Sequence, residues 1–361
     1  MLERHFGLCA GLLCGAVLLG GCRTTNVGAE TGTTPSSDTT EPGGSVTEPV
    51  TDQFETSMRI PADPDGVIPP TPRVWNASQV DNRRDSFEAD TIDVCNSTYT
   101  VPQELQQKVF DVTGRYSYLL KCTFYAIDLD SGMSVGLNAD DPMATASTVK
   151  AGYCYSCMLQ IENSDQYSLD DKVEYRPRHF LSGSGVTKTT PFGTVLTVRE
   201  LIHRTLYYSD NVAYYMLLDY FGGDYYNSLM ESIGVSHRLD WNGERWGFYS
   251  AHELGLIWQA IYRYRTQSDN GALLWEYLTT NLYNEFAEEL TEYPVIAHKS
   301  GWGKDRFAGF HDAGVVCTER GDYVLVVMTD TEESNRCLHR VARAVDNIMK
   351  DYAAWKVEPI S

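Results

Sequence analysis

The stretch "MATASTVKAGYCY", residues 143–155, sets a serine and a lysine three positions apart at the predicted start of a helix. Positions i and i+3 of a helix share one face, so the amine of Lys150 can reach the hydroxyl of Ser147. A serine at a helix N-terminus also lies at the positive end of the helix dipole, which favours a developing alkoxide. The spacing S-x-x-K arises about once by chance in a chain of this length, so the pair needs support from elsewhere.

Two further short motifs follow it in the chain. Ser209-Asp210-Asn211 lies in "YYSDNVAYY", and Lys299-Ser300-Gly301 ends an apolar segment that reads as a strand. Taken singly, the first motif is consistent with a helix cap and the second with a surface lysine. Three motifs in this order and in these settings are expected by chance in about one chain in a thousand or fewer. The set therefore favours a reactive Ser147–Lys150 pair.

The residues around the motifs predict an α/β fold. Before residue 141, aromatic and β-branched residues indicate two strands joined by a turn at Asp130-Ser131-Gly132. Residues 142–286 are mainly helical in pattern, and "SAHELGLIWQAIYRYR" opens with the capping box of Ser250 and Glu253. Strands return in "PVIAHKSGWG", "FAGFHDAGVVCTE" and "YVLVVMTDT", and a helix closes the chain. One lobe, 101–141 with 287–356, is thus built from both ends around a helical insert.

The three motifs are those of class A β-lactamases and penicillin-binding proteins, with Ser300 where the family usually has threonine. The sequence resembles this superfamily over about residues 105–355. "SGSGV" at 182–186 and "HDAGVV" after the third motif add to the resemblance. It implies an antiparallel sheet flanked by terminal helices, with an inserted all-helical lobe at residues 142–286.

The resemblance also implies roles for the motif residues. Ser147 attacks an amide carbonyl and becomes acylated, and Lys150 is its candidate base. Ser209 relays a proton to the leaving nitrogen, helped by Lys299. Asn211 orients Lys150 and the substrate.

Further roles concern substrate binding and support. Ser300 and Lys299 bind the substrate carboxylate, and Gly301 and Trp302 are further substrate-binding residues of the same strand. The backbone N–H groups of Ser147 and Trp302 form an oxyanion hole. The Trp302 indole offers a flat apolar surface to a bound chain. Asp210 is predicted to be structural.

One family feature is missing. Class A enzymes position a hydrolytic water with a glutamate in an E-x-x-L-N stretch, and no such stretch occurs here. Only five residues separate Glu244 from the helix cap at Ser250, so the corresponding loop is short. Glu244 is the substitute candidate for the base, and a solvated loop glutamate is an equal alternative.

Three functions follow as hypotheses: a class A type β-lactamase, a D,D-peptidase acting on D-Ala-D-Ala cell-wall peptides, and a catalytically silent wall-binding or sensor module. We favour the first. No cofactor or metal is predicted, because the histidines lack ligand spacing and no glycine-rich phosphate loop occurs. A net charge of −20 argues against nucleic acid as a partner.

The N-terminus predicts export and membrane tethering. Residues 1–22 read as a signal peptide, and their "LGGC" ending resembles a bacterial lipobox with Cys22 as the acylated residue. Residues 23–100 are predicted to be a tether rich in Thr, Ser, Pro and Gly, followed by a lead-in whose elements cannot be placed. We expect a protein that is lipid-anchored on the extracytoplasmic face of a bacterial membrane.

Overall fold

The structure is a computed structural model that describes residues 92–95, 122–243, 245–331 and 335–356. The chain divides into two compact units, residues 1–56 and 57–361, and every described residue belongs to the second. The predicted signal peptide, Cys22 and the predicted tether as far as residue 91 lie outside the described residues.

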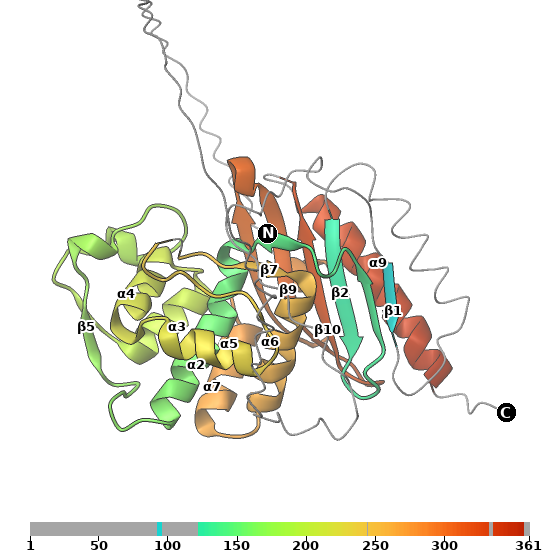
Figure 1. Cartoon of the computed structure of the whole chain (residues 1–361), viewed down its shortest axis with the longest axis horizontal. Coiled ribbons are helices and arrows are strands. Elements are labelled where there is room, and N and C mark those ends of the chain that lie inside the picture. Colours follow the sequence, from blue (N-terminus) through green and yellow to red (C-terminus); the bar gives the residue numbers. More distant parts are fainter. Residues whose placement is uncertain (1–91, 96–121, 244, 332–334, 357–361) are drawn as a thin grey trace, which may run out of the picture. The chain divides into compact units, whose positions relative to one another are not determined.

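A six-stranded antiparallel sheet has the strand order β1-β3-β2-β10-β9-β8 (Figure 1). The strands are β1 (Ile92–Cys95), β2 (Cys122–Asp128), β3 (Ser134–Leu137), β8 (Val295–Gly303), β9 (Gly309–Cys317) and β10 (Tyr323–Thr329). Every residue of β2 and β10 is buried, because both faces of the sheet are covered there. This burial explains why "YVLVVMT" is a continuous apolar run rather than an alternating one.

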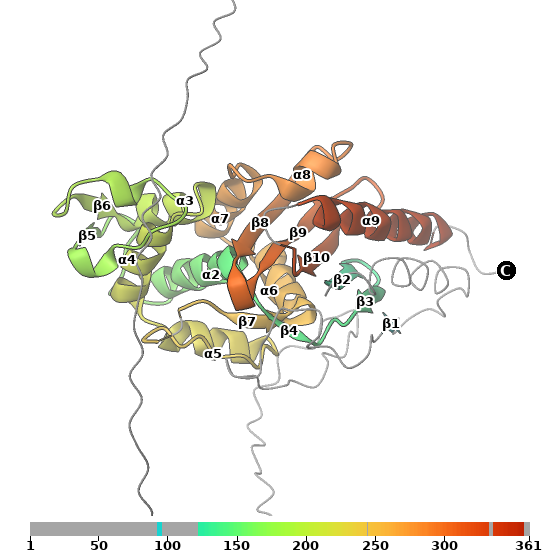
Figure 2. The same cartoon turned by 90° about the horizontal axis from the view of Figure 1, so that it is seen from above.

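Two helices cover opposite faces of the sheet. Helix α9 (Arg336–Lys356) contacts β10 and β2 on one face, and α6 (Ala251–Tyr264) contacts the same strands on the other (Figure 2). The buried side chains form two main clusters, one between the sheet and the helical lobe and one beneath α8 (Glu285–Glu289) and α9. The predicted antiparallel sheet assembled from both ends of the catalytic domain is confirmed.

The inserted lobe is helical with short strands added. Its helices are α2 (Val149–Glu162), α3 (Val198–Tyr207), α4 (Asn211–Phe221), α5 (Asp224–Ser232), α6 and α7 (Asp269–Thr279). It also contains the pairs β4 (Pro142–Ala144) with β7 (Phe248–Ser250) and β5 (Lys172–Glu174) with β6 (Val195–Thr197). The prediction of an all-helical lobe is corrected to this extent, because three-residue strands are too short to give a periodic pattern.

The N-terminal boundary of the sheet also differs from the prediction. Residues 92–95 fall in the segment that the sequence left without elements, and they pair with Ser134–Leu137 as the edge strand β1. The α/β lobe therefore begins before residue 101. The predicted helix at 102–112 lies outside the described residues.

Local signals explain where several helices begin. The capping box of Ser250 and Glu253 is present at the start of α6, as predicted. Asp210 caps α4, and Gly222 ends that helix with a φ of 74°. Within the described ranges, no helix combines the length and the apolar character that a membrane crossing requires.

Candidate active site

The segment before α2 presents Ser147. Strand β4 leads into a short 3-10 turn, η3 (Ala146–Thr148), which continues directly into α2. Thr145 holds this segment in place, because its backbone N–H and its hydroxyl both donate to the carbonyl of Gly247, at 3.0 and 2.8 Å. Ala146 adopts a φ of 47°, a left-handed conformation that side chains other than glycine disfavour. Ser147 therefore lies on a locally strained turn, which fixes the position of its hydroxyl.

Lys150 is the second residue of α2, about one turn after Ser147, and is fully buried. Its Nζ lies 3.0 Å from Ser147 Oγ, 2.6 Å from the Ser209 carbonyl oxygen and 2.7 Å from Asn211 Oδ1. The Ser209 hydroxyl is more distant, at 3.4 Å. The structure therefore brings the first two motifs together around one amine.

Aromatic rings close the other side of the Lys150 amine. Nζ lies 5.2 Å from the ring centroid of Trp246 and 5.8 Å from that of Tyr214. Burial lowers the pKa of Lys150 well below its usual value, and the positive charge of Lys299 lowers it further. A lowered pKa makes the neutral amine more accessible, and a neutral lysine can act as a base.

The second motif is held by hydrogen bonds from Asp210. Its Oδ1 accepts from the backbone N–H groups of Val212 and Ala213, and its Oδ2 accepts from those of Val186 and Thr187, both at 2.7 Å. One buried carboxylate thus caps α4 and ties the 182–187 loop to it. All four hydrogen bonds come from backbone N–H groups, and the structural role of Asp210 stays a prediction.

Asn211 and Ser209 face Lys150 from this capped segment. Ser209 has a φ of 51°, which turns its carbonyl toward Lys150. The amide of Asn211 donates to the Ser182 carbonyl at 3.0 Å. The hydroxyl of Ser184 donates to the Ser209 carbonyl at 2.6 Å and lies 3.2 Å from Asn211 Oδ1. The "SGSGV" stretch adds to the family resemblance, but the sequence did not predict that Ser184 lies in the site.

The third motif lies on β8, the edge strand beside η3. Lys299 is buried, and its Nζ donates to the Ser300 carbonyl at 2.8 Å. Burial lowers its pKa to about 8, while the Asp312 carboxylate acts in the opposite direction. Strand β8 contacts both η3 and α2, which carry Ser147 and Lys150, so the three motifs meet in one region.

Gly301 allows β8 to approach the nucleophile. A Cβ at this position would lie 2.6 Å from the backbone nitrogen of Ser147 and 2.8 Å from the carbonyl oxygen of Thr145. These distances are far below van der Waals contact, so only glycine fits. The backbone of β8 is thereby brought against the turn that carries Ser147.

Ser300 and Trp302 contact the segment before α8. The Ser300 hydroxyl donates to the Tyr283 carbonyl at 3.3 Å and is fully buried. The Trp302 ring meets Tyr283 edge to face at 4.8 Å and stacks on Phe310 at 5.9 Å. Tyr283 was not identified from the sequence, because no motif marks it.

Glu244 lies outside the described residues, but the chain on either side of it is described. The carbonyl of Arg245 accepts from the hydroxyl of Tyr214 at 2.8 Å, and Gly247 is bonded to Thr145. Strand β7 follows at once, so the segment after position 244 is as short as predicted. It places Trp246 beside the Lys150 amine.

Comparison with known proteins gives one family. The model of the β-lactamase enzyme family matches residues 104–351. Similar proteins include a β-lactamase of Amycolatopsis lactamdurans, 35% identical over 29% of this chain and 34% of the relative, and β-lactamase FAR-1 of Nocardia farcinica, 36% identical over 33% and 39%. The chain thus spans little more than a third of the length of these curated relatives. β-Lactamase VEB-1 of Pseudomonas aeruginosa is 21% identical over 60% of this chain and 80% of the relative.

Solved structures show the same fold. The penicillin-binding protein PBP-A superposes with a TM-score of 0.60 at 22% identity, covering 70% of this chain and all of PBP-A. A class A β-lactamase variant of the last common ancestor of Gram-negative bacteria superposes with a TM-score of 0.58 at 20% identity, covering 68% of this chain and 99% of the other. With the matched region covering most of the described residues, the chain belongs to the β-lactamase enzyme family.

Proposed function

We propose that this protein is a serine acyl hydrolase of the class A β-lactamase type, which opens β-lactam amides through an acyl-enzyme on Ser147. The observation that carries the proposal is the contact of Lys150 Nζ with Ser147 Oγ at 3.0 Å inside a buried, polar-lined position. A binding module has no need of a nucleophile whose neighbouring amine has a lowered pKa.

The proton inventory of Lys150 supports its role as the base. A neutral amine has two N–H donors and one lone pair. The two shortest contacts, to the Ser209 carbonyl and to Asn211 Oδ1, use the two donors. The lone pair is then left for the hydroxyl proton of Ser147. Attack of Oγ on the amide carbonyl transfers that proton to Nζ as the tetrahedral intermediate forms.

The remaining steps follow from the neighbouring groups. The backbone N–H groups of Ser147 and Trp302 stabilise the oxyanion, whose charge develops only on attack. The hydroxyl of Ser209, 3.4 Å from Lys150, passes a proton to the leaving nitrogen. The C–N bond breaks and the acyl group stays on Ser147 until water removes it. Lys299 and Ser300 bind the substrate carboxylate.

Acylation is tested with a fluorescent penicillin on the full chain. The wild type is expected to be labelled covalently and S147A to remain unlabelled. S156A is the matched control, because Ser156 lies on α2 and its buried hydroxyl donates to the Tyr153 carbonyl at 2.8 Å. Equal labelling of wild type and S147A would end the proposal. A silent binding module is the remaining alternative if the label is lost on denaturation.

A second candidate function, a D,D-peptidase with slow deacylation, is favoured by one observation. None of the hydrogen bonds of Lys150 in the described structure goes to a carboxylate, and Trp246 lies against its amine. Nitrocefin separates the two: steady turnover supports the β-lactamase, and a single burst supports the peptidase. Loss of turnover with intact acylation in E244Q would assign the deacylation step to Glu244.

We also propose that Cys22 carries the lipid anchor and that the folded domain acts outside the cytoplasmic membrane. The lipobox-like "LGGC" supports this location. Wild-type chain expressed in bacteria should incorporate radiolabelled fatty acid and sediment with membranes, whereas C22S should do neither. Labelling of C22S to the same extent as wild type contradicts the anchor and leaves the acylation chemistry untouched.

A further inference from the structure

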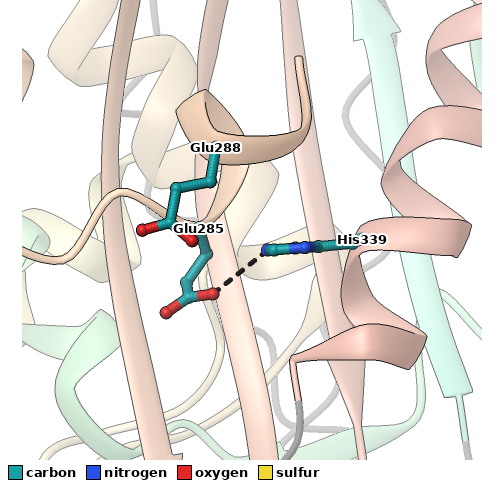
Figure 3. Close-up of side chains that lie close together, drawn as sticks. All are labelled: Glu285, Glu288 and His339. Atoms are coloured by element: carbon teal, nitrogen blue, oxygen red, sulfur yellow. Dashed lines mark hydrogen bonds and ion pairs between the residues drawn. The ribbon is translucent and has the colours of Figure 1, made fainter. Parts of the chain in front are cut away.

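Three metal-ligating side chains lie close together away from the candidate active site. Glu285 and Glu288 are three residues apart on α8 and share one side of it, and His339 projects toward them from α9 (Figure 3). Each offers one ligand atom, and these atoms all lie within 4.8 Å of one another. We call this set the α8–α9 cluster.

The acidic residues around the cluster are unequally neutralised. Glu289 and Glu292 contact Arg343, and Glu292 also contacts Lys350 at 2.5 Å. Glu285 instead bonds the uncharged amide of Asn335 at 2.8 Å. Among the described residues, Glu288 has no salt bridge at all. Among the ion pairs of the described residues, Glu285 pairs with His339, so at most one imidazolium charge balances the two carboxylates of Glu285 and Glu288.

The ring of His339 is oriented for a metal ligand. Its Nε2 lies 3.2 Å from Glu285 Oε2, and its Nδ1 lies 4.0 Å from Glu289 Oε2. At 4.0 Å the Glu289 carboxylate is too far from Nδ1 for a hydrogen bond, so the ring is held by its contact with Glu285. The amide of Asn335 donates to the same Glu285 oxygen at 2.8 Å and fixes that carboxylate.

We propose that Glu285, Glu288 and His339 bind one divalent transition-metal ion of the zinc class, which joins α8 to α9. Two carboxylates and one imidazole are ligands of that class, whereas Ca²⁺ and Mg²⁺ prefer oxygen alone. Tetrahedral ligands about 2.1 Å from zinc are about 3.4 Å apart. The Nε2–Oε2 spacing of 3.2 Å already matches that value. Glu288 is exposed, so its side chain can rotate inward to complete the set, with water as the fourth ligand.

The bound ion would be structural rather than catalytic. The first turn of α8 also holds the sheet, because the backbone N–H of Phe286 donates to Asp312 Oδ2 at 3.0 Å. The same carboxylate oxygen lies 2.8 Å from Nδ1 of His298, the residue before Lys299. An ion in the α8–α9 cluster therefore holds α8 to α9, and α8 is hydrogen-bonded to Asp312, which also contacts His298 on β8.

Binding is tested by equilibrium dialysis and calorimetry of the full chain with Zn²⁺ alone. We expect about one ion per chain, a rise in melting temperature on saturation, and binding weakened at least about tenfold in both E288Q and H339Q. E276Q is the matched control, because Glu276 is an exposed glutamate on α7, outside the cluster. It should bind Zn²⁺ as the wild type does.

The possible outcomes decide the question. Substitution of Co²⁺ gives an independent readout, since its visible absorption reports nitrogen and oxygen ligands and should vanish in H339Q. If wild type and E288Q bind Zn²⁺ alike, or if wild type binds none, the cluster is a His–Glu ion pair only and the proposal is wrong. Labelling of Ser147 by penicillin does not enter the test.

Discussion

In the proposed mechanism, the amines of the two buried lysines of the candidate site must carry different charges. Lys150 acts as a base only when it is neutral, and its pKa is lowered by burial and by the neighbouring charge of Lys299. Lys299 binds a carboxylate only when it is protonated, and burial lowers its pKa to about 8. The proposed mechanism therefore works only over a pH range in which Lys150 is neutral while Lys299 keeps its proton.

Acylation should fall as the pH rises above about 8, because Lys299 then loses the proton that attracts the substrate carboxylate. In K299R the guanidinium stays charged at all these pH values. We therefore expect the alkaline limb of the acylation rate constant to move upward by more than about one pH unit in K299R. The measurement is the rate of penicillin labelling from about pH 6 to about pH 10. An unchanged alkaline limb in K299R would assign the limb to another group.

A second prediction at the level of single residues concerns Gly301. The Cβ introduced by G301A would overlap the backbone of Ser147 and Thr145, so β8 must move away from the nucleophile. We expect a loss of about 1–3 kcal/mol in the free energy of unfolding and a large loss of acylation. Urea unfolding and penicillin labelling measure the two effects.

G193A is the control for this substitution. Gly193 has a φ of 90° with open space around its Cα, so alanine there costs only backbone strain of about 1 kcal/mol. Acylation in G193A should be unchanged. If G301A is labelled at the wild-type rate, the close approach of β8 to Ser147 is not required.

At the scale of elements, α4 and the 182–187 loop depend on a single carboxylate. Four backbone N–H groups donate to Asp210, which is fully buried. The site residues Ser209 and Asn211 flank it directly, and Ser184 lies in the loop that it holds. The second motif is therefore positioned by Asp210, which caps α4 and also binds the 182–187 loop.

D210A should lower the free energy of unfolding by about 3–5 kcal/mol, because it leaves several buried N–H groups without an acceptor. D210N keeps one acceptor oxygen and should lose roughly half as much. Chemical denaturation measures both values. Penicillin labelling per folded molecule should fall as well, and by more than the loss of stability alone explains, since Asn211 loses its position. Equal stability of D210A and D210N would show that only the helix cap contributes to stability.

The sequence predicted the elements that carry motifs but not the contacts between elements. Glu253 was identified as a capping-box residue because a local spacing encodes it. Trp246 and Tyr283 were missed, since their places depend on how loops from different parts of the chain meet. Ser147, Lys150, Ser209 and Lys299 could be named only because short motifs mark them.

At the scale of the whole molecule, the fold follows from burial on both faces of one sheet. Continuous apolar strands and a closing amphipathic helix were readable in the sequence. Strand β1 was not, because four residues beside a polar segment give no periodic signal. The strand order was implied by the family resemblance rather than by the pattern, since pairing between distant strands leaves no local trace.

Stability should depend on pH through His311, which joins two parts of the molecule. Its Nε2 donates to the carbonyl of Ala144 on β4 at 3.1 Å, and its Nδ1 accepts from the backbone N–H of Thr329 on β10 at 3.2 Å. This arrangement requires the neutral ring, and burial lowers the pKa of His311 to about 4.

Because the unfolded histidine has a pKa near 6.5, the unfolded state binds more protons between about pH 6.5 and 4. The contribution of His311 is therefore present above that range and is lost as the pH falls. We expect about 2 kcal/mol less stability at pH 5 than at pH 7 from this group, measured by urea unfolding. H311Q can donate and accept without titrating, so its pH slope should be smaller by that amount. Parallel slopes would contradict the assignment.

The left-handed backbone at Ala146 has a consequence for the protein's mutational history. Glycine adopts that conformation without penalty, so A146G relieves about 1 kcal/mol of strain in the native state but loosens the unfolded chain by a comparable amount. In a population of variants screened for expression alone, alanine and glycine at position 146 should therefore be recovered about equally. Screening the same population for survival on penicillin should favour alanine over glycine at position 146, because the more rigid alanine holds the Ser147 hydroxyl at a fixed angle.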